Sequence, residues 1–173
     1  YTRINRLIRE KCDIILNNST GGGINGDMVR PLPNGLWEIQ WEERIKGLQG
    51  EGVEMCTLDA QTVIASFDRK EILVATPPSR IHQIARMMKE RGIKPEWEVF
   101  SLHDIVQDVP RALAEGLDDE RPFINMVVGA NAFQGALVGS GVIPALTAGA
   151  CTTITFDAGA VSSNAPGYPD GNY

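Results

Sequence analysis

Helical and strand-like segments alternate along this chain, and this alternation restricts the fold more than any other feature of the sequence. Apolar, β-prone runs at 13–18, 53–59, 94–100 and 123–128 are separated by segments that include apolar residues at helical spacing. Such alternation is typical of βαβ units around a parallel sheet, joined by right-handed crossovers. The sequence therefore predicts an α/β fold.

Two forms of parallel sheet fit these units. A parallel (β/α)8 TIM barrel typically takes about 250 residues, so the 173 residues of this chain would hold about half of one. An open doubly wound sheet is satisfied by roughly four or five strands. Both forms place their active sites at the carboxyl ends of the strands.

The remaining segments divide into predicted helices and loops. We expect helices at 2–12, from about 42, at 77–91 and at 102–116, the last bent or divided by Pro110. Residues 24–41 are rich in Gly, Pro and Asn and predict a long loop, of the kind that serves binding or is disordered. An irregular stretch is expected after Asp59. We expect a partial barrel over 1–136 and a divergent, weakly structured tail over 137–173.

Glu96 and Glu98 are separated by one residue in a segment that otherwise resembles a buried strand. Side chains alternate across a strand, so both carboxylates share one face while Trp97 and Val99 take the other. Carboxylates on an inner face are costly unless they are paired, hydrogen-bonded or bound to a cation. The pair therefore indicates a site, with a solvated edge strand as the alternative.

Other polar residues also lie at the carboxyl ends of the predicted strands, where their side chains would meet at one end of the sheet. They are Asn17, Ser19, Thr57, Asp59 and Asn125. Ser19 and Thr57 are equally well explained as turn residues, and Asp59 as a cap. After the first strand, Ser19 to Gly23 reads Ser-Thr-Gly-Gly-Gly, whose close-set N–H groups suit an anion. This segment matches neither GxGxxG nor the GxxxxGK[ST] phosphate loop.

The composition of the chain argues against some classes of partner and indicates a cellular compartment. A formal net charge of −6 argues against a nucleic-acid partner, and no run approaches the roughly 18 apolar residues of a membrane span. The three cysteines are scattered singly, which predicts reduced thiols and a cytoplasmic location. The first residue is Tyr1 rather than Met, so we expect the chain to be part of a longer one.

Four ordered segments resemble the β-keto acid cleavage enzyme family, of which the 3-keto-5-aminohexanoate cleavage enzyme is the best-known member. They are Asn18 to Gly23, Glu54 to Asp59, Gly92 to Phe100 and Pro122 to Gly129. The resemblance implies a zinc-dependent (β/α)8 barrel, with its third to sixth strands in this chain, that converts a β-keto acid and acetyl-CoA to acetoacetate and a CoA ester. The zinc would act as a Lewis acid on the keto oxygen.

The candidate site combines this resemblance with the strand pattern. The catalytic candidates are Glu96, Glu98 and Asp59, with the choice between the two glutamates left open. The substrate-binding candidates are Ser19, Thr20, Gly21, Gly22, Thr57 and Asn125. The family's zinc ligands, a His-x-His and a distant glutamate, have no counterpart here, and the chain has no HxH, HExxH or CxxC spacing. We therefore expect no metal ligand from this chain.

A half-barrel would leave two sheet edges and an apolar face open, so we expect this chain to be unstable or to associate, and the intact enzyme to be a homo-oligomer. We also expect no turnover by this chain alone. Two alternatives stay open: a catalytically inactive truncated homologue, and a metal-free α/β protein that binds a small carboxylate.

Overall fold

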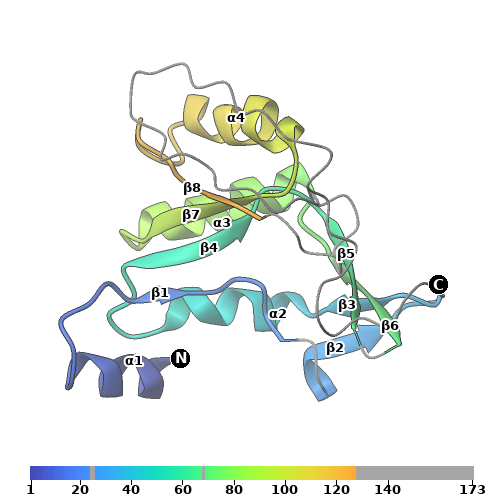
Figure 1. Ribbon diagram of the computed structural model, residues 1–173, viewed down its shortest axis with the longest axis horizontal. Helices are drawn as coiled ribbons and strands as arrows, with labels where there is room; N and C mark the ends of the chain where they lie inside the picture. Colours follow the sequence, from blue (N-terminus) through green and yellow to red (C-terminus); the bar gives the residue numbers. More distant parts are fainter. Residues whose placement is uncertain (24–25, 68, 128–173) are drawn as a thin grey trace, which may run out of the picture.

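A parallel sheet forms the centre of the computed structural model, which describes residues 1–23, 26–67 and 69–127 (Figure 1). Its strands are β1 (Asn17–Asn18), β4 (Met55–Asp59), β7 (Lys94–Val99) and β8 (Phe123–Met126). All neighbours are parallel, and the strand order β1-β4-β7-β8 follows the chain. The predicted α/β class and parallel pairing are confirmed, and this order lacks the reversal of a doubly wound sheet. The tail predicted over 137–173 lies outside the described residues.

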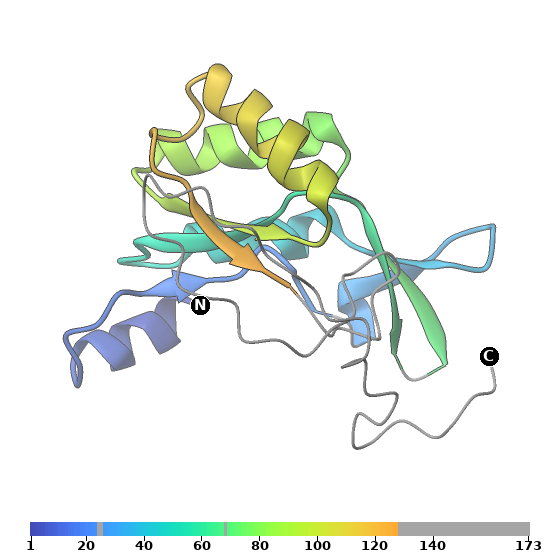
Figure 2. The same ribbon diagram turned by 45° about the horizontal axis from the view of Figure 1, so that its top comes forward.

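Helices cover one face of this sheet (Figure 2). They are α2 (Trp41–Arg44), η2 (Ile45–Gln49), α3 (Pro78–Glu90), η3 (Asp104–Asp108) and α4 (Val109–Ala114). The helix expected at 102–116 is divided, with a π-helical turn before α4 and Pro110 in the first turn of α4.

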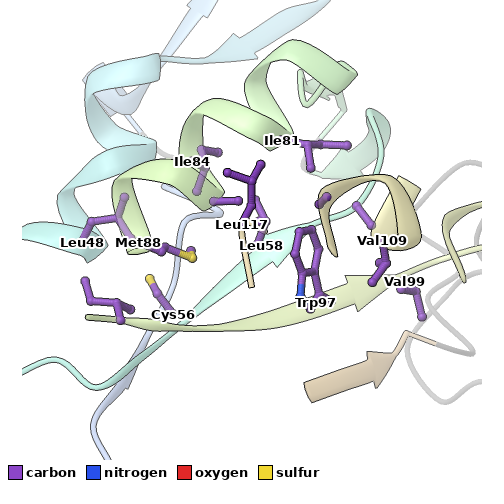
Figure 3. Close-up of a cluster of buried hydrophobic side chains, with 14 residues drawn as sticks. Leu48, Cys56, Leu58, Ile81, Ile84, Met88, Trp97, Val99, Val109 and Leu117 are labelled. Atoms are coloured by element: carbon purple, nitrogen blue, oxygen red, sulfur yellow. The ribbon is translucent and has the colours of Figure 1, made fainter. Parts of the chain in front are cut away.

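The main core lies between these helices and the sheet. Leu58 and Trp97 of the sheet are fully buried against Ile84 and Met88 of α3 (Figure 3). These positions alternate along β4 and β7 with the polar ones, as the period-2 pattern predicts. The sheet therefore has one face for packing and one face for polar side chains.

A second sheet, which the sequence did not predict, lies beyond the carboxyl end of β4 (Figure 1). Its order is β2-β3-β6-β5, from β2 (Val29–Pro31), β3 (Trp37–Ile39), β5 (Val63–Phe67) and β6 (Lys70–Val74), and β2 follows the 3-10 turn η1 (Gly26–Met28). The predictions of a loop at 24–41 and of an irregular stretch after Asp59 were therefore wrong for the residues that form these strands. Two short antiparallel hairpins stabilise each other here through the parallel pairing of β3 with β6.

The amino-terminal edge of the parallel sheet also differs from expectation. Helix α1 (Thr2–Arg9) forms as predicted, but the strand expected over 13–18 is limited to β1. Ile14 and Ile15 are 53% and 63% exposed, and Ile4 of α1 is 62% exposed. No helix among the described residues has the length and apolar character to cross a membrane.

Candidate functional site

Strand register places the predicted polar side chains next to one another. Thr57 of β4 is aligned with Glu96 of β7. Two residues further toward the carboxyl ends, the strand register aligns Asp59 of β4 with Glu98 of β7 and Asn125 of β8. Because aligned residues of parallel strands point to the same face, these side chains share the face opposite the main core.

Two amides hold Glu96. Asn17 donates to Oε2 of Glu96, and Asn125 Nδ2 donates to Oε1 at 2.9 Å. Only 9% of Glu96 is exposed. Both of its oxygens therefore already accept a hydrogen bond, and the side chain is fixed between β1 and β8.

Glu98 lies against a buried ion pair. The guanidinium of Arg44, fully buried, donates from Nη2 to Oδ2 of Asp59 at 2.8 Å. Glu98 is hydrogen-bonded to Asp59, and burial together with the charge of Asp59 raises the pKa of Glu98 to about 8. Burial also raises the pKa of Asp59, while Arg44 opposes that rise. Burial and the neighbouring carboxylate thus favour the protonated form of Glu98 near neutral pH.

The hydroxyls of Ser19 and Thr57 join the Gly-rich segment to the carboxyl groups. Thr57 Oγ1 lies 3.3 Å from Ser19 Oγ, and Thr57 is also hydrogen-bonded to Glu98. Gly21 N–H donates to Ser19 Oγ at 2.9 Å. The buried Thr20 hydroxyl donates to the Thr57 carbonyl at 2.6 Å, so it ties the Gly-rich segment to β4. Ser19 and Thr57 are both partly exposed.

Gly22 lets the Gly-rich segment turn close to the second sheet. Its φ is +73°, and a Cβ there would lie 2.6 Å from Cγ2 of Ile39. A side chain would therefore meet both backbone strain and a steric clash. The turn holds Ser19 and Gly21 over the carboxyl end of β4.

The structure thus brings the predicted residues together at one end of the sheet, although Thr20 is turned away into a buried bond. Asp59 pairs with Arg44 instead of capping a helix. Sequence reasoning missed Arg44 as part of the site. The available signal was its position, three residues after Trp41 and before Ile45 and Leu48, on what would be an apolar helical face.

No three His, Cys, Asp or Glu side chains in the described ranges are grouped so that they could hold a metal ion. His82 of α3 is paired with Glu115, and His103 is paired with Asp108 of η3. Both pairs lie in the helical layer. The described residues therefore do not fit the zinc that the resemblance implies, and we derive no chemical step through it.

The raised pKa of Glu98 predicts a pH-dependent stability. The folded chain binds this proton with a pKa of about 8, against an ordinary value of 4.5. The stabilisation is therefore complete below about pH 4.5 and is lost as the pH rises toward 8. We expect the free energy of unfolding of the Glu98→Gln variant, measured by chemical denaturation, to fall less between pH 5 and 8.5 than that of the wild type. Glu71→Gln, at an exposed position of β6, is the control and should keep the wild-type dependence.

Gly22→Ala should destabilise the fold more than Gly35→Ala. Both glycines have positive φ, +73° and +89°, but a Cβ at Gly35 meets nothing within 4 Å. Both variants lose about 1–2 kcal/mol to backbone strain, and overpacking adds about 1–3 kcal/mol at Gly22. Equal unfolding free energies for the two variants would contradict the close approach of Gly22 to Ile39.

Comparison with known proteins agrees with the resemblance seen in the sequence. A family model described as beta-keto acid cleavage enzyme matches residues 1–148. The chain is 26% identical over 176 residues to 3-dehydrocarnitine:acetyl-CoA trimethylamine transferase of Rhizobium meliloti (strain 1021), covering 98% of this chain and 57% of that protein. It is 38% identical over 95 residues to a 3-keto-5-aminohexanoate cleavage enzyme of Fusobacterium nucleatum, covering 54% of this chain and 28% of that protein. The chain thus spans only part of these relatives, and it belongs to the β-keto acid cleavage enzyme family.

Proposed function

We propose that this chain supplies substrate-binding and acid–base residues for a reaction in which a β-keto acid and acetyl-CoA give acetoacetate and a CoA ester. The names of the two relatives support this proposal, since one specifies acetyl-CoA and the other cleavage of a 3-keto acid. The observation that carries it is the alignment of Asp59 with Glu98, beside the Ser19 and Thr57 hydroxyls. Family membership weighs against an unrelated carboxylate-binding α/β protein.

In the proposed reaction, the fragment that carries the substrate carboxylate moves from the keto carbon to the acetyl group, and the remaining acyl group passes to CoA sulfur. A proton leaves carbon 2 of the β-keto acid and returns to the same carbon in acetoacetate. We assign this proton transfer to the Asp59–Glu98 pair. With a pKa of about 8, the minor ionised form of Glu98 accepts the proton near neutral pH, and the protonated carboxyl group that results returns it.

Substrate binding is assigned to the Gly-rich segment. The hydroxyl of Ser19 and the backbone N–H groups of Gly21 and Gly22 would receive the carboxylate or keto end, with Thr57 beside them. Glu96 is assigned to positioning, because Asn17 and Asn125 already occupy both of its oxygens. This assignment chooses Glu98 over Glu96 as the catalytic glutamate.

Barrel closure, zinc dependence, a cytoplasmic location and homo-oligomer formation are further parts of the proposal. The chain-order arrangement of the parallel strands supports a barrel. The zinc ligands would have to include residues other than the described ones. The free thiols of Cys12 and Cys56 suit a reducing compartment. The exposed Ile4, Ile14 and Ile15 support association.

Binding of acetoacetate, measured by calorimetry on the 173-residue chain, tests the assigned substrate site. Loss of a hydrogen bond to a charged group costs about 1.5–3 kcal/mol, so Ser19→Ala should weaken binding by about tenfold or more. Ser79→Ala, at an exposed position at the start of α3, is the matched control and should leave the affinity unchanged. Equal affinities in both variants, or no binding by the wild-type chain, would reject the site.

An inactive truncated homologue is the second candidate, and turnover by this chain alone would exclude it. We expect no acetoacetate formation from 3-keto-5-aminohexanoate and acetyl-CoA by this chain alone. Release of acetoacetate, followed by mass spectrometry, would overturn that expectation and exclude the inactive homologue.

A further inference from the structure

Arg44 is a fully buried cation that the proposed reaction does not use. It ends the short helix α2, and its guanidinium reaches three separate segments. Nη2 donates to Asp59 at 2.8 Å, Nε to the Thr20 carbonyl at 2.9 Å, and Nη1 to the Ala75 carbonyl at 2.7 Å. These partners come from the end of β4, the Gly-rich segment and the chain after β6.

An apolar residue at this position would avoid the cost of burying a charge. Arg44 falls on the same helical face as Trp41 and Leu48, where a leucine or methionine would continue the core. Burial lowers the pKa of Arg44, yet an arginine side chain keeps its charge at neutral pH. Since a buried charge needs a counter-charge, Asp59 must be an anion for this arrangement to be stable.

The charges around the guanidinium decide where the site's proton lies. Glu98 is hydrogen-bonded to Asp59, and one buried cation does not balance two anions. Because Arg44 contacts Asp59 directly, the proton belongs on Glu98.

The other charged or titratable groups acting on this set lie on neighbouring elements. Glu38 of the second sheet and Arg80 of α3 act on Arg44 with opposite signs. Glu96 repels the charged form of Glu98. Cys56, on the core face of β4, is held as a thiol because burial raises its pKa to about 12.

We propose that Arg44 is a positioning residue of the site: its guanidinium keeps Asp59 ionised, leaves the proton on Glu98, and holds the Thr20 carbonyl so that the Gly-rich segment lies over the same two carboxyl groups. This deepens the proposed function and rests on it for its catalytic meaning. One side chain therefore fixes both the position of the substrate-binding turn and the location of the proton. Gly22 of the same segment also lies next to Arg44, since a Cβ there would be in ordinary van der Waals contact with Cγ of Arg44, at 3.5 Å.

The test is an NMR titration of the Asp59 and Glu98 carboxyl carbons in the wild-type chain and in variants. In Arg44→Met, which keeps the length but removes the charge, the pKa of Asp59 should rise by about one unit or more. Arg44→Lys should restore most of the wild-type value. Arg80→Met removes another arginine that donates to the Ala75 carbonyl, at 3.1 Å, and should leave the pKa of Asp59 within a few tenths of the wild-type value. An unchanged Asp59 titration in folded Arg44→Met would overturn the proposal.

A second variant covers the case in which Arg44→Met does not fold. Asp59→Asn removes the direct partner of Arg44 and the carboxylate charge that disfavours ionised Glu98, so the pKa of Glu98 should fall by about one unit or more. A pKa of Glu98 that stays at the wild-type value in Asp59→Asn would also reject the assignment.

These titrations need no substrate, so they succeed or fail independently of the proposed function. Acetoacetate affinity, measured from pH 6 to 9, adds the catalytic meaning. A pH profile that shifts in Arg44→Met by the same amount as the pKa of Glu98 supports the positioning role. A profile that stays in place while the pKa of Glu98 moves would overturn that role. If the wild-type chain binds no acetoacetate, the proposed function fails while the titrations still decide what Arg44 does.

Discussion

The buried ion pair between Arg44 and Asp59 is the interaction on which the rest of the site depends. Taking both groups out of water is expensive, and the cost is offset only because the guanidinium also finds two carbonyl oxygens. Removing one partner of such a pair typically costs about 3–5 kcal/mol. The pair joins the Gly-rich segment, β4 and the end of the second sheet, so the geometry of the polar face and the stability of the fold share one set of contacts.

Strand alternation separates packing from chemistry. On β7, Trp97 is fully buried in the core, while Glu96 and Glu98 on either side face the opposite layer. A register shift by one residue would exchange these roles and put carboxylates into the core. The same hydrophobic contacts that hold α3 on the sheet therefore also aim the acidic groups.

The sequence predicted what depends on a simple period. Glu96 and Glu98 were recognised because two carboxylates at i and i+2 in an apolar strand have no packing role. The strands β4, β7 and β8 lie inside the ranges expected for them. The positions of Asn125 and Asp59 beside Glu98 follow from parallel register. Their chemical roles stay predictions.

What the sequence could not supply depends on contacts between distant segments. The second sheet forms because β3 pairs with β6, and neither hairpin is recognisable alone. Arg44 was missed because its three partners are 15 to 31 residues away. Exposure of Ile14 was missed because an apolar run predicts burial without saying whether a neighbour is present.

The central claim is that the Asp59–Glu98 pair, beside Arg44, carries a single proton located on Glu98. A neutron crystal structure of the deuterated chain near pH 7 would test this directly, because deuterium on a carboxyl oxygen is visible to neutrons. The account predicts deuterium on an oxygen of Glu98 and none on Asp59. Deuterium on Asp59 instead, or on neither side chain, would contradict it.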